Sequence, residues 1–172
     1  MNSKMEGIRM AELTLTRIDN RLIHGQVIVK WSRIANSNRI LIVDDTLSND
    51  PFMVDIYQMA APSGMKVELM STEEAGKSYQ KDELGEGKIM LLFKTVSSAF
   101  AAYQKGLHFP TLQLGGIPNE QGKKKIVTAV SVDSTELKQI CELHNEGVEV
   151  SAQIIPEESK ISFDEILKRV GE

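Results

Sequence analysis

Cysteine, long apolar runs and a secretion signal are scarce or missing in this sequence. Cys141 is the single cysteine among 172 residues, which excludes an internal disulfide and favours a reducing compartment. The longest apolar runs, such as residues 40–43 and 89–93, are far too short to cross a bilayer. The first residues contain no apolar core of the kind that directs secretion. We therefore expect a cytoplasmic protein.

An excess of basic charge is also missing. The formal net charge is −4, and charged residues make up 26% of the chain. No broad basic surface is implied, so we expect no nucleic-acid partner and no general attraction to anionic membranes. The hydrophobic content of 41% is enough for one core. We expect one domain over residues 12–172, preceded by an N-terminal tail of residues 1–11.

Strand-like and helical segments alternate along the chain. Strands are expected at residues 13–18, 40–43, 66–70, 88–93, 111–114, 126–130 and 148–153. Helices are expected at residues 24–36, at about 50–61, from 71 onward, and at 96–104, 133–147 and 163–170. This order predicts an α/β fold: a single-domain, open, mainly parallel sheet with helices on both faces. Such sheets bind ligands beyond the carboxyl ends of their strands.

Two helices carry more detailed predictions. In the helix over residues 24–36, the spacing of four apolar residues predicts one buried face. These residues are Val27, Trp31, Ile34 and Ala35. The next helix has Pro51 in its first turn, and we expect Ser48 or Asn49 to cap it.

The segment TRIDNRLIHGQV, residues 16–27, is the strongest candidate for chemistry. His24 is expected at the start of a helix, where free N–H groups and the helix dipole favour an anion. Arg21 offers a guanidinium to phosphate oxygens, and Asp19 is placed to hold a ring nitrogen or to position Arg21. Together they suit a nucleophilic histidine that takes up a phosphoryl group. From residue types alone, a surface histidine in a salt-bridged turn is the commoner case.

Other features point to structure and not to a second site. The segment GGIPNEQGKKK resembles a phosphate loop, but the spacing of its glycines and its final lysines depart from a Walker motif. No GxGxxG follows the first strand, and no histidines have zinc-like spacing. We therefore expect neither a metal nor a bound cofactor. His108 and His144 are expected to have structural roles, and Trp31 is expected in the core.

Residues 16–27 closely resemble the active-site loop of the IIB components of sugar phosphotransferase systems of the mannose/fructose/sorbose family. The resemblance covers about residues 12–170 and includes, in order, ILIVDDTLSNDP, MAAPSGMKVEL, IMLLFKT, LQLGGIP followed by QGKKK, and AVSVD. Two positions depart from the family pattern: Asn20 stands where Asp or Glu is usual, and Gln113 stands where Asn is commoner. The resemblance implies an open, mainly parallel α/β sheet, in agreement with the pattern of strands and helices.

The resemblance also implies roles for the residues of the loop. His24 would accept a phosphoryl group from a phosphohistidine of the IIA component and pass it to a sugar. The activity would be that of a protein-N(pi)-phosphohistidine–sugar phosphotransferase. Arg21 would stabilise the transferred group, and Asp19 matches the first acidic residue of the family loop. A covalent phosphohistidine would be the intermediate, with no cofactor and no metal.

The implied partners are the IIA component and the membrane components IIC and IID, which import the sugar. The protein would associate peripherally with that transporter. Lys123, Lys124 and Lys125 follow the LQLGGIP segment, and we expect them to dock a partner, although three lysines in a loop are more often merely solvated. Two other functions stay open: a non-catalytic regulatory module that is phosphorylated, and a small phosphoester hydrolase using His24 and Asp19. Mannose, fructose, sorbose and amino sugars are all possible substrates.

Overall fold

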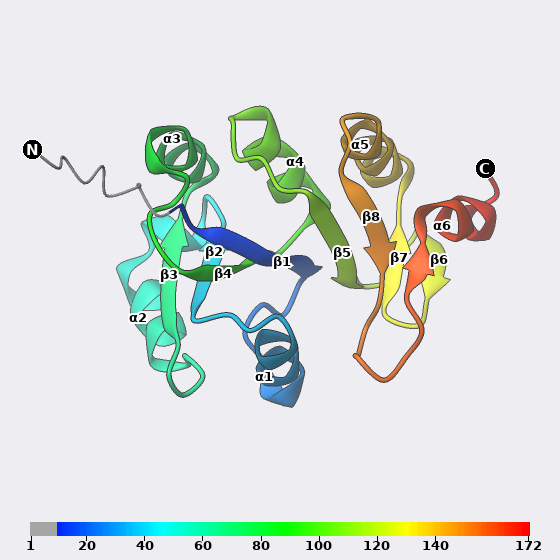
Figure 1. The fold of residues 1–172 in the computed structure, drawn as a ribbon. Helices are drawn as coiled ribbons and strands as arrows, with labels where there is room; N and C mark the ends of the chain where they lie inside the picture. The colour runs from blue at the N-terminus through cyan, green and yellow to red at the C-terminus, as the bar shows by residue number, and fades with distance from the viewer. Residues whose placement is uncertain (1–9) are drawn as a thin grey trace, which may run out of the picture.

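A computed structural model describes residues 10–172, and it contains one open sheet with helices on both faces (Figure 1). The sheet has seven strands in the order β3-β2-β4-β1-β5-β8-β9. Their bounds are β1 Glu12–Asp19, β2 Arg39–Val43, β3 Lys66–Met70, β4 Lys88–Phe93, β5 Thr111–Gly116, β8 Glu149–Ala152 and β9 Ile161–Ser162. All pairs are parallel except β8 with β9. The predicted fold class is therefore confirmed.

Residues 10–172 form six α-helices and one short 3-10 helix, and all but α6 lie between strands. They are α1 Gly25–Ile34, η1 Leu47–Asn49, α2 Pro51–Met59, α3 Thr72–Asp82, α4 Val96–Gln104, α5 Ser134–Asn145 and α6 Phe163–Val170. In Figure 1, α1 and α2 lie on one side of the sheet, and α3, α4 and α5 lie on the other. Within residues 10–172, no helix combines the length and the apolar character needed to cross a membrane.

Strands β2 and β4 are apolar on both faces because both faces are covered. Side chains alternate across a strand, so neighbours along it enter different layers. In β2, Ile40 and Ile42 pack with Trp31 on the side of α1. Leu41 and Val43 pack in the second apolar cluster, which includes residues of α3, α4 and α5. An uninterrupted apolar run is thus the expected sequence of such a strand.

The predicted buried face of α1 is partly wrong. Trp31 is buried as expected, but Ile28 and Ser32 are its buried companions, and Ile34 is 62% exposed. Val27 to Val29 are all β-branched apolar residues, so their spacing does not by itself select one face. The way the helix packs on the sheet decides which of them is covered.

Two further expectations about local structure need correction. Residues 126–130 were expected to form one strand, but they are divided between β6 (Lys124–Val127) and β7 (Val130–Val132), which form an antiparallel hairpin outside the main sheet. The cap of α2 is Asp50, whose side chain accepts hydrogen bonds from the N–H groups of Phe52 and Met53. Pro51 occupies the first helical position, and this places the cap one residue before it. The expected tail of residues 1–11 lies outside the described residues except for Met10 and Ala11.

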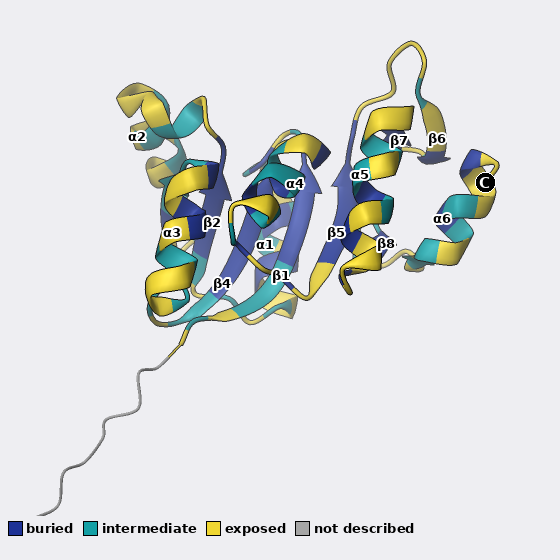
Figure 2. Ribbon diagram, turned by 90° about the horizontal axis from the view of Figure 1, so that it is seen from above, coloured by how far each residue is buried: buried dark blue, intermediate teal, exposed yellow. Residues whose placement is uncertain are grey.

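The carboxyl end of β1 lies where the connections from two neighbouring strands leave toward opposite faces of the sheet. β1 pairs with β4 on one side and with β5 on the other. The helix after β1, α1, and the helix after β4, α4, cover opposite faces of the sheet (Figure 1). Ligands of open α/β sheets bind beyond the carboxyl ends of strands at such a point. In Figure 2, these ends point upward, and α2 and the loop between β5 and β6 stand above them.

Candidate active site

The loop from β1 to α1 is anchored at its centre. Leu22 is fully buried, although its φ of +56° is unusual for a residue other than glycine. Its N–H donates to the carbonyl of Asp19 at 2.9 Å, and the N–H of Asn20 donates to the carbonyl of Gly116. A strained conformation fixed by burial is common where a site must be held in one shape. The turn at Leu22 brings His24 back to Asp19 at the end of β1.

Asp19 is the centre of the site. Its side chain is fully buried, and three residues of the same segment donate to its two oxygens. Nε2 of His24 lies 3.1 Å from Oδ2, and the N–H of Arg21 lies 3.1 Å from Oδ1. The Nε of Arg21 also reaches Oδ1, at 3.3 Å. A buried carboxylate in this position is not part of a solvated surface turn.

The surroundings keep Asp19 charged. Burial by itself would raise the pKa of this carboxyl, because it removes the charged form from water. The hydrogen bonds from the Arg21 N–H, from His24 and from the Arg21 guanidinium act the other way, as does the charge of Arg17. The net effect is a pKa below the ordinary value, so the carboxylate is ionised near neutral pH.

Arg17 supports Asp19 from inside the protein, and the sequence reasoning gave it no role. Its guanidinium is fully buried, with Nη2 3.4 Å from Oδ2 of Asp19. Nη1 donates to Oε1 of Gln113 at 2.5 Å and to the carbonyl of Gln153 at 2.8 Å, while Nη2 donates to the carbonyl of Ile154 at 2.9 Å. Burial lowers its pKa and the charge of Asp19 opposes that change.

Two glycines at the end of β5 leave room for these charged groups. A Cβ atom at Gly115 would lie 2.0 Å from Cζ of Arg17, and one at Gly116 would lie 2.6 Å from Oδ1 of Asp19. Neither position therefore accepts a side chain without displacing a charged group. The paired glycines of the LQLGGI segment are the sequence signal for this close approach, together with the arginine inside an apolar strand.

His24 is held at one ring nitrogen and open at the other. It is the N-cap residue of α1, its side chain is 21% exposed, and it makes no side-chain capping bond. Asp19 holds Nε2, which leaves Nδ1 as the nitrogen that can meet a partner. The first turn of α1 contains no acidic residue, so its N–H groups are suited to an anion. Arg21 is 48% exposed and adds a positive charge beside the ring.

The three predicted site residues are therefore together, whereas the bonds of Lys123 and Lys124 go to other parts of the chain. Lys123 is mostly buried and its Nζ lies 3.0 Å from Oε1 of Glu136. The Nζ of Lys124 donates to the carbonyl of Val170 at 2.8 Å, and Lys125 is exposed. These bonds attach the start of β6 to α5 and to the end of α6, not to the loop of His24.

The other two histidines pack against aromatic rings. His108 is stacked on Tyr103 with ring centroids 4.8 Å apart, and His144 is stacked on Phe163 at 3.8 Å. Among residues 10–172, no group of three or more His, Cys, Asp or Glu side chains is arranged to hold a metal ion. The structural roles predicted for these histidines agree with the contacts.

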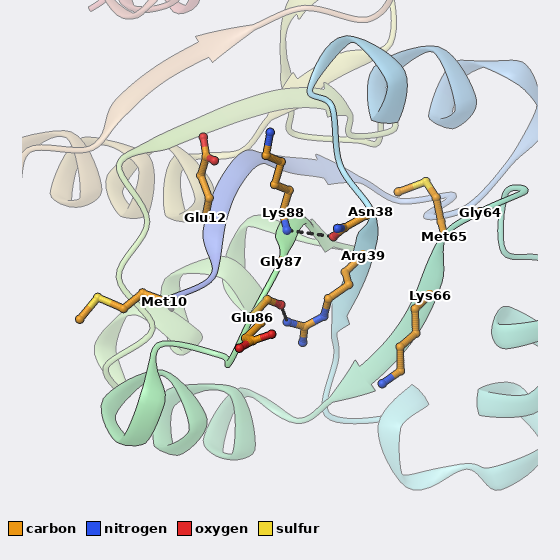
Figure 3. A pocket seen from close by; sticks show the side chains of 10 residues that line it. All are labelled: Met10, Glu12, Asn38, Arg39, Gly64, Met65, Lys66, Glu86, Gly87 and Lys88. Atoms are coloured by element: carbon orange, nitrogen blue, oxygen red, sulfur yellow. Dashed lines mark hydrogen bonds between the residues drawn. The ribbon is translucent and has the colours of Figure 1, made fainter. Parts of the chain in front are cut away.

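A wide depression of about 910 Å³ lies at the amino ends of the strands (Figure 3), whereas His24 follows the carboxyl end of β1. Its lining includes the first residues of four parallel strands: Glu12, Arg39, Lys66 and Lys88. The guanidinium of Arg39 is already bound, by Oε2 of Glu68 and by the carbonyl of Leu84. This depression is separate from the site at the carboxyl edge.

Comparison with known proteins decides the family. The family model of the sorbose subfamily IIB component of the phosphotransferase system (PTS) matches residues 13–172. The chain belongs to this family. The resemblance seen in the sequence is confirmed, and IIB components are phosphotransferases that accept a phosphoryl group from IIA and transfer it to a sugar.

Individual relatives of this IIB component are similar over nearly the whole chain. The PTS sorbose-specific EIIB component of Klebsiella pneumoniae is 34% identical over 94% of this chain and 96% of its own length. The crystal structure of the IIBSor domain from that organism is 33% identical, with a TM-score of 0.85 over 94% of this chain and 99% of that chain. The structure of manxB from Thermoanaerobacter tengcongensis is 35% identical, with a TM-score of 0.87 over 95% and 99%.

Proposed function

We propose that His24 carries the phosphoryl group, on Nδ1, and that Asp19 and Arg21 assist the transfer. The observation that supports this most directly is the 3.1 Å contact between Nε2 of His24 and Oδ2 of Asp19. Asp19 is ionised, so Nε2–H of His24 donates a hydrogen bond to it, and in this tautomer Nδ1 carries the lone pair. Because Asp19 is buried and fixed in position, it also sets the orientation of the His24 ring. Carboxylates that bind the second ring nitrogen of a catalytic histidine act in the same way.

The first transfer moves the phosphoryl group from the IIA component to His24. The lone pair of Nδ1 attacks phosphorus, the P–N bond to the IIA imidazole breaks, and its electron pair returns to that ring. A positive charge develops on the His24 ring, and the carboxylate of Asp19 stabilises it. Arg21 and the N–H groups of the first turn of α1 stabilise the phosphoryl oxygens. Positioning and charge supply most of the catalysis in such a step.

The second transfer moves the group to the sugar that IIC and IID deliver. A sugar hydroxyl oxygen attacks phosphorus, the bond to Nδ1 breaks, and the hydroxyl proton leaves to solvent or to a base. The protein would work in the cytoplasm, at the surface of the membrane transporter. The covalent phosphohistidine is the intermediate, and the residues of the site require neither a cofactor nor a metal for either step.

The test is phosphorylation with phosphoenolpyruvate, enzyme I, the histidine phosphocarrier protein and the cognate IIA, followed by mapping of the acid-labile phosphate. We expect label on His24 alone, a ³¹P signal typical of Nδ1-phosphohistidine, and none in His24→Ala. His108→Ala and His144→Ala are matched controls that should keep the label. Phosphate on either of those histidines, or on Nε2 of His24, would contradict the assignment. Label on His24 without transfer to any of the candidate sugars, with IIC and IID present, would favour a regulatory role.

A further inference from the structure

Helix α2 presents an apolar stripe to solvent. Phe52 is 71% exposed, Ile56 is 39% exposed and Met59 is 84% exposed. They are spaced at four and three residues along the helix, so they lie in one row on one side. The opposite side packs on the protein through Tyr57, and no residue of α2 is fully buried. Most surface helices turn such a row toward the core.

The stripe is not a by-product of a poorly formed helix. Asp50 caps α2 through two backbone N–H groups, and Pro51 occupies its first position. The 3-10 helix before it is held by Asp44, which accepts from the N–H groups of Thr46 and Leu47. The protein therefore builds a rigid support whose outer face is apolar. Contiguous exposed apolar surface of this kind usually marks an interaction site.

The segment of chain that carries the stripe has charged residues of one sign. Residues 44–65 contain four aspartates and no lysine or arginine: Asp44, Asp45, Asp50 and Asp55. Asp50 and Asp55 are exposed, and both belong to the cap or body of α2. A partner for this face should therefore combine an apolar surface with basic charge.

The stripe lies on the surface that serves His24. α2 follows β2, which is separated from β1 only by β4, so the two strand ends are about 10 Å apart at the usual strand spacing. Figure 2 shows α2 standing above the carboxyl ends of the strands, and the His24 loop follows the carboxyl end of β1. An ordinary interface covers about 800 Å² of each partner. A protein that reaches His24 over this edge is large enough to cover α2 as well.

We propose that the stripe of α2 docks onto the cytoplasmic loops of the membrane sugar-transport component. This rests on the proposed function. Cytoplasmic loops of membrane proteins are enriched in lysine and arginine, which complements the exposed Asp50 and Asp55 of α2. Direct binding to lipid is disfavoured, because the cytoplasmic leaflet is itself negatively charged. An apolar row with few charges also fits a lasting association better than a brief encounter with soluble IIA.

The test compares membrane vesicles that contain IIC and IID with vesicles of the same lipids that lack them. Binding of the whole protein is measured by co-sedimentation, for the unaltered chain, the triple variant Phe52→Ser, Ile56→Ser, Met59→Ser, and Ile34→Ser. Ile34 is 62% exposed at the far end of α1, and it is the matched apolar control. We expect the triple variant to bind about 10²-fold more weakly, and Ile34→Ser to bind normally.

Phosphorylation of His24 by phospho-IIA in solution is the second readout, and it should be unchanged in the triple variant. Loss of that labelling in a variant with normal circular dichroism would make IIA the occupant and overturn the proposal. The proposal would also be overturned if the triple variant sedimented with the vesicles as the unaltered chain does, or if the unaltered chain bound equally to vesicles without IIC and IID. It would be overturned as well if the unaltered chain were a dimer in solution and the triple variant a monomer. His24→Ala should still bind vesicles, so the docking result does not depend on which residue is phosphorylated.

A charge variant tests the same surface without removing apolar contacts. Asp55→Lys should weaken binding to the IIC- and IID-containing vesicles at low ionic strength and much less at high ionic strength. Glu142→Lys, on the exposed side of α5, makes the same charge change elsewhere and should have little effect. Equal effects of the two variants would show that net charge, and not the face of α2, controls the association.

Discussion

Arg17 and Asp19 form an ion pair that solvent does not reach: Nη2 lies 3.4 Å from Oδ2, and both side chains are fully buried. The same oxygen of Asp19 lies 3.1 Å from Nε2 of His24. The exposed ring is thus connected to the interior through a single carboxylate. Arg17 is in turn bound to residues of β5 and of the segment after β8, so three parts of the chain fix the position of His24.

We predict that Arg17→Gln lowers both stability and transfer. Removing one partner of a buried ion pair leaves the other charge uncompensated, at a cost on the order of 3–5 kcal/mol in the free energy of unfolding. Urea denaturation checks this, with Arg33→Gln on the exposed last turn of α1 as control. Phosphorylation by phospho-IIA should also become more sensitive to acid, because the pKa of Asp19 rises. A stable variant with an unchanged pH profile would show that Arg17 does not act on the site.

We predict that Asp19→Asn slows phosphorylation of His24 by about 10²-fold or more, because a neutral amide stabilises the charged ring less well. Its effect on stability should depend on pH. The folded pKa of Asp19 lies below the ordinary 3.8, so the ionised carboxylate stabilises the protein fully above that value. This contribution is lost as the pH falls through the lowered pKa. The difference in unfolding free energy between the two proteins should therefore narrow below about pH 4, and urea denaturation at a series of pH values measures it.

The parts of the fold that the sequence predicts well are those with one unambiguous signal. The bounds predicted for β3, β4, α4 and α6 agree with the structure, because each is an alternating strand, an apolar run or a capped helix. The hairpin of β6 and β7 was missed because its turn, at Thr128 and Ala129, contains none of the residues that usually mark turns. The cap of α2 was misplaced because three consecutive residues, 48–50, are all of types that cap helices. Pro51 at the first helical position identifies Asp50 as the cap.

The candidate site is only partly visible in the sequence. Asp19, Arg21 and His24 are within six residues of one another, and the loop motif identifies them together. Arg17 stands inside β1, and its partner Gln113 is 96 residues away along the chain. Its burial follows from the pairing of β1 with β5 and from the space above Gly115, neither of which local spacing reveals. The role of Arg17 therefore depends on contacts between distant parts of the chain, which the loop motif does not contain.

We predict that Arg21→Lys slows transfer from phospho-IIA by about 10²-fold with little effect on folding. Lysine keeps the charge but loses the planar fork that contacts Asp19 and that we propose meets the phosphoryl oxygens. Arg21 is 48% exposed, so its replacement should leave the unfolding free energy nearly unchanged. Stopped-flow phosphorylation at saturating IIA measures the step, and Arg33→Lys is the control. A rate close to that of the unaltered protein would reduce Arg21 to an ordinary surface residue.

We predict that Lys123, Lys124 and Lys125 help to dock a partner, but that their contributions are unequal. Lys123 is paired with Glu136 and Lys124 is bound to the end of α6, so Lys125 is the lysine most available to a partner. Replacing all three by Gln should slow phosphorylation by IIA at low ionic strength, and less at high, because rim charges act mainly on the association rate. Lys125→Gln alone should reproduce most of this effect, whereas Lys123→Gln should mainly lower the unfolding free energy. If the triple variant associates with both IIA and the membrane components at the normal rate in low salt, the lysines are merely solvated.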